Sequence, residues 1–441
     1  MPLELSKYYY LFEREGRYFL YAPLSNSFAE IDGELYEYIL SNQKDISFLD
    51  DEEKALLRKM KVIEVNDDLE INKLKSNILL RRFDPRHLHL TINPTLACNF
   101  ACPYCFEASH PTQFMTDEVE NEIIAFIQKR ANASYLHITW FGGEPLLAFN
   151  RIVSLSKKMQ SLGLKYSSGM ITNGYLLTPD KVALFEELQI SSVQITIDGS
   201  EQTHNSRRFR KDGGPTYKTI IRNIDEAQKC SPKTTIHIRV NVDRTNSNEF
   251  FDVLNYFNSK KYPNVSVSPG FVNDLSRSDR NHCVYDNDAI AAFLKEVYYK
   301  YGYQNKLIYP PNITRVCAVR NPNAVVIGPL GELYKCWNDV GDLNRSYGYI
   351  DGRLTNEAVL YEYLVKADHL NDPKCNACKL FPVCDGGCPY QRIHNEKAGL
   401  PQDTCSLFKE HIEDFLMLRY DYRKNKQVLT EKVFAENVTS N

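Results

Sequence analysis

The chain has 441 residues, 43% of them hydrophobic and 25% charged, and its formal net charge is −3. These values are ordinary for a globular protein, and they give no electrostatic reason to expect nucleic acid or an anionic membrane as a partner. Residues 1–16 lack the pattern of a signal peptide, and no apolar run reaches the roughly eighteen residues of a membrane span. We therefore expect a cytoplasmic protein of two or three domains.

Cysteine is the unusual residue of the composition, with twelve copies in the chain. In a long chain without an export signal, they favour metal ligation over disulfide bonds. Ten of the twelve fall into two groups, one at residues 98–105 and the other at residues 317–405, whereas Cys230 and Cys283 stand apart.

Residues 1 to about 80 are predicted to form a unit of their own. We expect three strands there, at residues 7–12, 17–22 and 27–31. Each is rich in Tyr, Phe or Leu or is bounded by a turn signal. Helices are expected after Asp32 and Asp50, the second with an acidic first turn that suits the helix dipole. A closing strand at 62–65 and a charged linker helix at 70–82 complete the unit.

From His87 onward the pattern changes to alternating strands and helices. The predicted strands are residues 87–93, 135–140, 165–172, 191–197, 234–241 and 264–269. The predicted helices are residues 117–130, 151–162, 179–188, 217–228, 247–259 and 288–301. Six repeats at this spacing indicate an α/β fold with a parallel sheet, helices outside it and partial closure into a barrel. Ligands of such barrels bind at the carboxyl ends of the strands.

The first cysteine group follows the strand at 87–93 with the spacing C-x3-C-x2-C, and its members are Cys98, Cys102 and Cys105. Three thiolates can hold three irons of a cubic four-iron cluster and leave the fourth iron open to a small molecule. A zinc site would want a fourth Cys or His nearby, and the nearest histidine, His110, lies beyond the loop. Three buried core cysteines are the plainer alternative, but the proline and aromatic neighbours do not fit core patterning.

Polar motifs stand where the next strands are expected to end. They are Gly142-Gly143-Glu144-Pro145, Thr172-Asn173-Gly174 and Thr196-Ile197-Asp198-Gly199, and Asn241 ends the fifth strand. Two glycines let the backbone approach a ligand closely, and Glu144 offers a carboxylate to an ammonium group. The plainer alternatives are a turn that starts a helix for the first motif and a structural role for Asn241.

The C-x3-C-x2-C loop, with Tyr104 directly before its third cysteine, and the Gly-Gly-Glu-Pro motif resemble those of radical S-adenosylmethionine (SAM) enzymes. The resemblance implies that the three cysteines hold a [4Fe-4S] cluster and that SAM chelates its open iron. Gly142, Gly143, Glu144 and Pro145 would bind the amino group of SAM. Further SAM-binding candidates are Tyr104, Asn173, Thr196, Asp198 and Arg208.

Two positions depart from the family pattern Ser-x-Asp-Gly followed by His-Asp-x-x-Arg. This chain has Thr196 in place of the serine, which keeps a hydroxyl for a ribose contact, and Asn205 in place of the aspartate. Arg208 is the candidate partner of the SAM carboxylate, with Arg207 and Arg210 as rivals. The alternative for each arginine is an exposed loop residue.

The second cysteine group begins with Cys317. Thirteen residues separate Cys317 from Gly331, and four residues separate Gly331 from Cys336. It continues with Cys375, Cys378, Cys384, Cys388 and Cys405. This spacing resembles the SPASM domain, whereas a zinc ribbon would need four or eight ligands. The resemblance implies two auxiliary [4Fe-4S] clusters. Cys317, Cys336 and Cys388 would hold the nearer one, with Cys283, another side chain or substrate as its fourth ligand. Cys375, Cys378, Cys384 and Cys405 would hold the farther one. A hairpin is expected at 326–336.

The resemblance also implies the division of the chain. Residues 1–80 would be a winged-helix-like domain of the PqqD type, which binds a leader peptide as an added strand, although a stabilising cap is the alternative. Residues 81–305 would form the partial (β/α)6 barrel of TIM type and residues 306–425 the SPASM domain. A capping helix is expected at 407–422, and residues 426–441 would be a mobile tail.

Three hypotheses about function follow from the resemblance. The first is an oxidoreductase-type maturase that installs a thioether or other side-chain crosslink in a ribosomally made precursor peptide. A donor of the flavodoxin or ferredoxin type would supply the electron that yields a 5′-deoxyadenosyl radical, which abstracts hydrogen from the peptide. The second is an anaerobic sulfatase-maturase-like enzyme that forms formylglycine, but such enzymes place Asp where this chain has Trp337, directly after Cys336. The third is a non-catalytic iron–sulfur scaffold.

Overall fold

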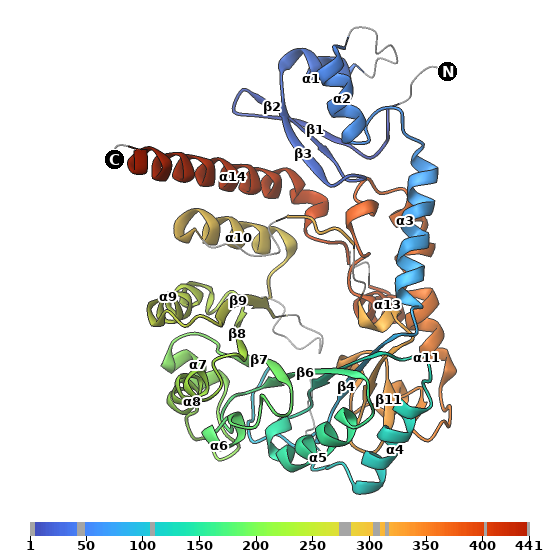
Figure 1. Ribbon diagram of the computed structural model, residues 1–441, viewed down its shortest axis with the longest axis vertical. Coiled ribbons are helices and arrows are strands. Elements are labelled where there is room, and N and C mark those ends of the chain that lie inside the picture. Colours follow the sequence, from blue (N-terminus) through green and yellow to red (C-terminus); the bar gives the residue numbers. More distant parts are fainter. Residues whose placement is uncertain are drawn as a thin grey trace.

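The computed structural model describes residues 5–41, 49–105, 111–272, 284–302, 309–313, 317–400 and 404–438, with the backbone alone after residue 424. Figure 1 shows a curved sheet with helices on its outer side and a smaller sheet near the amino terminus. Cys283, expected as a candidate ligand, lies outside the described residues. None of the described helices combines the length and apolar character needed to cross a membrane.

The amino-terminal unit has a three-stranded antiparallel sheet and two helices over its own hydrophobic core. The strands are β1 (Tyr10–Arg14), β2 (Arg17–Ala22) and β3 (Ser27–Ile31), and the helices are α1 (Gly33–Leu40) and α2 (Asp51–Lys59). The Asp32 and Asp50 side chains cap the two helices, as their acidic starts predicted. The linker helix is α3 (Asp67–Arg82).

The prediction of a strand at residues 62–65 is wrong. Lys61 has a φ of +60°, and the amide of Val62 donates to the carbonyl of Leu57 at 2.9 Å. This is the hydrogen-bonded end of α2 with a left-handed residue after it, and Val62 is buried as the apolar contact of that motif. Apolar residues there reflect a helix end rather than an extended strand.

The barrel strands run parallel and lie beside one another in chain order. They are β4 (His87–Ile92), β5 (Tyr135–Trp140), β6 (Lys165–Thr172), β7 (Ile190–Thr196), β8 (Thr235–Val242) and β9 (Val265–Phe271). The helices are α4 (Asp117–Gln128), α5 (Phe149–Gln160), α6 (Pro179–Val182), α7 (Glu201–Arg207), α8 (Tyr217–Cys230), α9 (Phe250–Lys260) and α10 (Asn287–Tyr301). All six predicted strands are present, and α6 is shorter than expected.

The predicted hairpin continues the barrel sheet. β10 (Ala324–Ile327) pairs parallel with β4, with Ile327 opposite Ile92, and β11 (Glu332–Tyr334) and β12 (Gly348–Tyr349) follow in antiparallel pairings. The nine-stranded sheet therefore ends at β12 and β9 and is not closed. Because β10 and β4 are neighbours, the chain segments that lead to both cysteine groups belong to one sheet.

The remaining helices are α11 (Glu357–Tyr361), α12 (Pro373–Asn376), α13 (Pro389–Lys397) and α14 (Phe408–Val438). The capping helix expected at 407–422 is thus present in α14, which continues to Val438. Tyr420 of α14 packs edge-on against Phe19 of the small sheet, with ring centroids 5.2 Å apart. Figure 1 shows α14 lying beside both α10 and this sheet.

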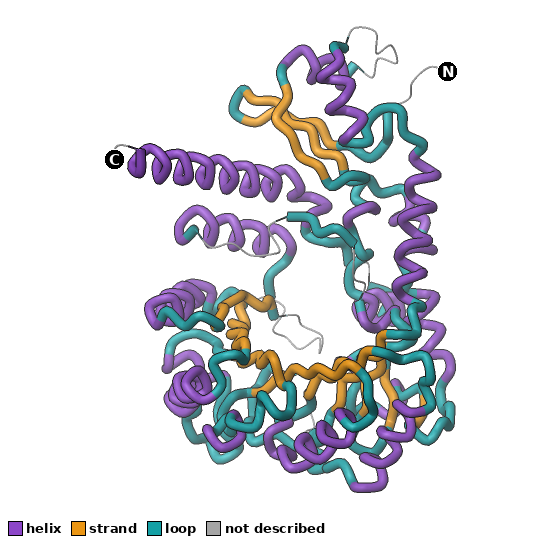
Figure 2. The backbone as a smooth tube through the Cα atoms, viewed as in Figure 1, coloured by secondary structure: helices purple, strands orange, loops and turns teal. Residues whose placement is uncertain are grey.

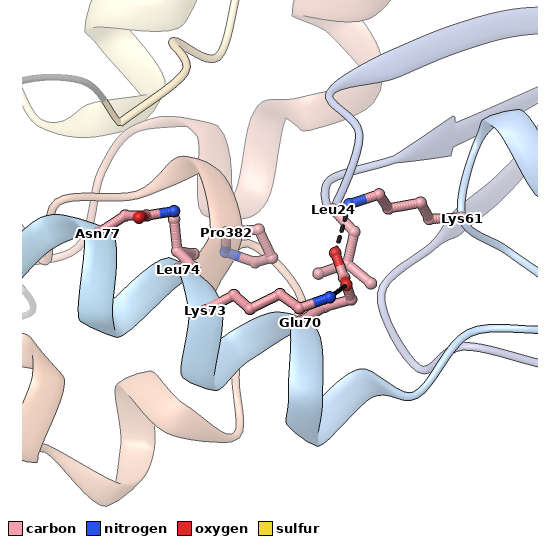
Figure 3. A pocket seen from close by; sticks show the side chains of 7 residues that line it. All are labelled: Leu24, Lys61, Glu70, Lys73, Leu74, Asn77 and Pro382. Carbon is pink, nitrogen blue, oxygen red and sulfur yellow. Dashed lines mark hydrogen bonds and ion pairs between the residues drawn. The ribbon is translucent and has the colours of Figure 1, made fainter.

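A pocket of about 340 Å³ marks the place where the amino-terminal unit, α3 and the carboxyl-terminal region meet (Figure 3). Its polar centre is Glu70, which forms ion pairs with Lys61 and Lys73. Leu24 and Pro382 line it from the two flanking regions. The Glu70 carboxylate is already neutralised by these two lysines. We therefore interpret the pocket as a contact between parts of the chain rather than as a ligand site.

Candidate functional site

The first cysteine loop lies against the turn that follows β5. The amide of Glu144 donates to the carbonyl of Ala97 at 2.9 Å, one residue before Cys98. A Cβ on Gly143 would lie 2.4 Å from that carbonyl oxygen, and a Cβ on Gly142, whose φ is +112°, would lie 2.3 Å from the oxygen of Thr95. Both glycines are therefore required by the close approach of the two chain segments.

Glu144 joins the ends of β5 and β6. Its fully buried carboxylate accepts hydrogen bonds from the amide of Leu146 at 3.0 Å, the hydroxyl of Thr172 at 2.7 Å and the amide of Asn173 at 2.8 Å. Burial raises the pKa of Glu144, although these hydrogen bonds oppose the shift. Pro145 begins the short 3-10 helix at Pro145–Ala148. Oε2 accepts one of these hydrogen bonds and keeps a lone pair that an ammonium group can use.

The Tyr104 hydroxyl is the centre of a buried polar network. It donates to Asp198 Oδ2 at 2.6 Å and accepts from Arg208 Nη1 at 2.6 Å and from Asn241 Nδ2 at 3.3 Å. Burial is the main cause that raises the pKa of Tyr104, with Asp198 adding to it and Arg208 opposing it. The cluster loop is thereby tied to the ends of β7 and β8.

The three candidate arginines differ in their surroundings. Arg208 is 9% exposed, and Arg207 bridges Asp198 at 3.2 Å and Asp243 at 2.8 Å. Arg210 pairs with the exposed Asp212 in the following loop. Two buried atoms of the network, Nε of Arg208 and Oδ1 of Asp198, have no hydrogen-bond partner within the described ranges. Such buried atoms are rare without a ligand or water, so this site has open positions for a bound molecule.

The two residues that depart from the family pattern both lie in ordered surroundings. Asn205 Oδ1 accepts the backbone amides of Thr216 and Tyr217 at 2.9 and 3.0 Å, where α8 begins. The neighbouring His204 accepts the amide of Asp198 at 3.3 Å, and burial lowers its pKa well below the usual value. Asparagine at 205 thus supplies a helix cap. Thr196 is buried at the end of β7.

The first cysteine group fits a cluster by the chemistry of its sulfurs. Burial raises the pKa of Cys98 to about 12, and a bound metal would have to displace this thiol proton. The Phe100 amide donates to Cys98 Sγ at 3.4 Å, and Asn173 Nδ2 lies 4.0 Å from the same sulfur. Donors aimed at sulfur tune the potential of an iron–sulfur cluster. Phe106 and Glu107 of the loop lie outside the described residues.

Cys317, Cys336 and Cys388 are neighbours in space. Burial above all, and then Asp339 and the other two thiols, raise the pKa of Cys336. The Trp337 ring lies 5.7 Å from that of Phe141, which precedes the Gly142–Pro145 turn. Asp339, two residues after Trp337, is buried and accepts a hydrogen bond from Tyr363.

The other four cysteines of the second group line one cavity of about 560 Å³. They are Cys375, Cys378, Cys384 and Cys405. Arg392 Nη2 donates to Cys375 Sγ at 3.1 Å, and the Gly386 amide donates to Cys384 Sγ at 3.3 Å. Within the described part of the chain, no three His, Cys, Asp or Glu side chains converge on a position for a single metal ion. The cavity brings together the four residues that the resemblance to the SPASM domain assigned to the farther cluster.

Sequence reasoning missed two residues of this region. Asp243 holds Arg207, and Arg239 of β8 donates to Asn241 at 2.9 Å. The alternation of apolar and polar residues along 235–242 was the available signal, because it places Arg239 and Asn241 on the same face of the strand.

Comparisons with known proteins agree with this arrangement. The family model of the radical SAM superfamily matches residues 92–257. The chain is 24% identical to "Radical SAM cyclopropyl synthase TigE" of Paramaledivibacter caminithermalis, over 96% of this chain and 99% of that protein. It is 29% identical to a serine-type anaerobic sulfatase-maturating enzyme of Bacteroides thetaiotaomicron, over 44% of this chain and 49% of the relative.

Among solved structures, Streptococcus suis SuiB bound to precursor peptide SuiA has a TM-score of 0.54 at 13% identity, and covers 92% of this chain and 100% of that one. The chain therefore has a radical SAM fold, which confirms the predicted α/β architecture. SAM and an iron–sulfur cluster are the cofactors that this family implies.

Proposed function

We propose that this chain is a radical SAM maturase that modifies a ribosomally made precursor peptide. The observation that carries the proposal is the contact between the Cys98–Cys105 loop and the Gly142–Pro145 turn, with the Tyr104 network beside them. When bound, a SAM-ligated [4Fe-4S] cluster supplies a 5′-deoxyadenosyl radical that removes a hydrogen atom from the substrate. An external donor of the flavodoxin or ferredoxin type would supply the one electron that SAM cleavage consumes.

The protein's own residues hold and orient SAM. Cys98, Cys102 and Cys105 hold the cluster, and Glu144 Oε2 accepts the SAM ammonium group. Arg208 Nε, buried without a described partner, donates to the SAM carboxylate, and Asp198 Oδ1 accepts from a hydroxyl of the cofactor. Arg208 is buried and Tyr104 is half-buried, a setting that would limit the access of water to the place where the radical forms.

The second cysteine group holds two auxiliary [4Fe-4S] clusters in this proposal. Cys317, Cys336 and Cys388 bind the nearer cluster, and Cys375, Cys378, Cys384 and Cys405 bind the farther one. The common cavity of the last four cysteines supports their assignment to one cluster. When bound, such clusters would offer an acceptor for the electron that remains on the substrate after hydrogen abstraction, or a binding position for its thiolate.

The amino-terminal unit is the proposed site for the leader of the precursor peptide. It has a separate core, and β3 is an edge strand of its sheet, to which an extended peptide can add by main-chain hydrogen bonds. The solved structure of SuiB with its precursor peptide SuiA supports a peptide as the substrate class. We assign residues 1–80 to this unit, 81–305 to the barrel and 306–425 to the auxiliary-cluster domain.

Formylglycine formation is the second candidate function. The similarity to the sulfatase-maturating enzyme favours it. Trp337, whose ring lies tilted beside that of Phe141, counts against it, because the resemblance would require an aspartate there. Which of the two products forms, and at which residue, depends on the peptide that is bound.

Anaerobic reconstitution tests the proposal. We expect about twelve irons per chain and formation of 5′-deoxyadenosine from SAM with a strong reductant. Coexpression with a candidate precursor peptide, taken from any short open reading frame that neighbours the gene, should show a mass loss on that peptide by mass spectrometry. Four irons or fewer, stoichiometric zinc, or a loaded protein that leaves SAM intact would contradict it.

The Cys98→Ala variant examines the first cluster separately from the auxiliary clusters. It should abolish 5′-deoxyadenosine formation while about two thirds of the iron remains, because only one of three clusters loses a ligand. Cys230→Ala is the matched control, since Cys230 is exposed on α8. SAM cleavage by the Cys98 variant at the wild-type rate would refute the role of Cys98.

A further inference from the structure

The barrel strands carry basic side chains and no acidic ones. The sequences of β4 to β9 contain no Asp or Glu, and their basic and histidine residues are His87, His89, His137, Lys165, His237 and Arg239. The residues between these, such as Leu88, Ile138 and Ile238, are at most 1% exposed under the outer helices. Alternation therefore places the basic residues on the concave side of the sheet, which Figure 2 shows facing away from the surrounding helices.

Arg239 lies on this concave face close to the cluster loop. Its Nε donates to Asn241 Oδ1 at 2.9 Å, and Asn241 in turn donates to the Tyr104 hydroxyl. The guanidinium occupies the space over Gly270 of β9, where a Cβ would lie 2.2 Å from Arg239 Cζ. Gly270 thus makes room for the guanidinium at a fixed position.

The terminal nitrogens of Arg239 have no hydrogen-bond or ion-pair partner among the described residues. Among the described residues, no carboxylate forms an ion pair with Arg239, and its Nη1 and Nη2 donate no hydrogen bond. Burial lowers the pKa of Arg239, although Tyr104 and Asp198 oppose the shift. Asp198 Oδ2 is bonded to Tyr104 and Arg207, and within the described residues no hydrogen bond or ion pair joins Asp198 to Arg239. A half-buried guanidinium whose two terminal nitrogens are both available as donors fits a carboxylate that binds through both oxygens.

We propose that Arg239 binds a carboxylate of the peptide substrate, the side chain of an Asp or Glu near the residue that is modified. This assignment rests on the proposed peptide-modifying function and goes beyond it by naming the substrate's charge. A separate cavity of about 730 Å³ at the amino ends of β4 to β6 also has a basic lining, which includes Arg81, His87, His89, His137 and Lys165. Asp84, also in this cavity, is paired with Arg86. An anionic segment is the peptide that this surface attracts.

Binding of model peptides tests the assignment. The probes are a fluorescein-labelled Gly-Glu-Gly-Glu-Gly peptide and its Gln counterpart, added to the reconstituted enzyme with SAM and followed by fluorescence anisotropy. The wild type should prefer the Glu peptide by about tenfold, the ratio expected for a charge-assisted bidentate pair. Arg239→Gln should reduce the preference to twofold or less, and Arg239→Lys should keep part of it.

Two further variants guard against a general defect. Gly270→Ala retains the arginine but places a Cβ against its guanidinium, so it should also reduce the preference for Glu. Arg353→Gln removes an exposed arginine that pairs with Asp351, and it should leave the preference unchanged. Equal binding of the two peptides by the wild type, or no binding of either, would overturn the assignment if the enzyme still cleaves SAM. A wild type that does not cleave SAM would instead contradict the proposed function.

The carboxylate of SAM has the same chemistry as an acidic side chain, and a second measurement separates the two sources. Equilibrium dialysis gives the affinity for SAM and for decarboxylated SAM. The ratio of these affinities should be the same for the wild type and Arg239→Gln. A tenfold fall in that ratio, confined to Arg239→Gln, would assign the guanidinium to SAM and overturn its role in binding peptide.

Discussion

At the scale of single residues, the contact between Gly143 and the chain before Cys98 fixes the position of the cluster loop. Any side chain at 143 meets the carbonyl oxygens of Leu96 and Ala97, which are backbone atoms that cannot rotate away. The shape of the cysteine loop thus depends on a residue that carries no functional group. The Gly142–Pro145 turn therefore has a packing role that does not depend on a bound ligand.

Gly143→Ala should therefore displace the loop and prevent loading of the first cluster. We expect a loss of about one third of the iron and of SAM cleavage, while the auxiliary clusters remain. Iron analysis with electron paramagnetic resonance measures both. Gly163→Ala is the matched control, because a Cβ at Gly163 meets nothing within 4 Å even though its φ is +74°. Full iron loading of the Gly143 variant would show that the loop tolerates the methyl group.

At the scale of elements, α4 and α5 are joined by a buried carboxylate. Glu120 of α4 is fully buried and accepts hydrogen bonds from Ser154 and Arg151, and it pairs with Lys158 at 2.8 Å. Burial alone would raise the pKa of Glu120, but the three α5 side chains together lower it. Because the folded-state pKa is lowered, this contribution to stability is present above the unfolded value of about 4.3 and is lost as pH falls through the folded value.

Glu120→Gln should lower the free energy of unfolding by about 1–3 kcal/mol at pH 7, because a charged acceptor is replaced by a neutral one. The difference from the wild type should shrink as the pH falls from about 4.3 through the lowered folded-state pKa of Glu120. Urea unfolding followed by circular dichroism at pH 7 and at a series of pH values below about 4 measures this. Glu122→Gln, an exposed position on the same helix, should change stability by less than about 0.5 kcal/mol. A pH-independent difference would mean that the charge of Glu120 is not what stabilises the contact.

At the scale of the whole molecule, a buried ion pair connects the linker helix α3 to the region of the second cysteine group. Arg82 at the end of α3 donates to Asp368 through Nη1 at 2.6 Å and Nη2 at 3.2 Å, and the two side chains are 2% and 5% exposed. A bidentate pair of this kind fixes both the distance and the orientation of the parts it joins. The amino-terminal unit is thereby held relative to the second cysteine group.

Arg82→Met should destabilise the protein by about 3–5 kcal/mol, because Asp368 is left as an unpaired buried charge. Adding Asp368→Leu should recover most of the loss, since both charges are then absent. The midpoint of thermal unfolding under anaerobic conditions measures the two variants. Arg86→Met removes an exposed pair with Asp84 and should cost about 1 kcal/mol or less. A double variant as unstable as the single one would show that the pair acts through packing instead.

Local signals in the sequence determined the elements of the fold. The strands at 135–140 and 165–172 and the helix starts at Asp32 and Asp50 were predicted because alternation and capping involve residues a few positions apart. The same locality explains the error at Val62, where an apolar helix end resembles a short strand. The cysteine spacing likewise gave the two groups.

Only the tertiary structure decided which distant residues meet. Tyr104 contacts Asn241 across 137 positions, and Arg82 contacts Asp368 across 286. β10 adds to β4 although most of the barrel separates them in the chain. Such contacts depend on sheet order and on the burial of facing surfaces, which no window of neighbouring residues contains. The sequence by itself thus determined the elements and the cysteine groups, and the packing of the sheet decided the Tyr104 network and the open guanidinium of Arg239.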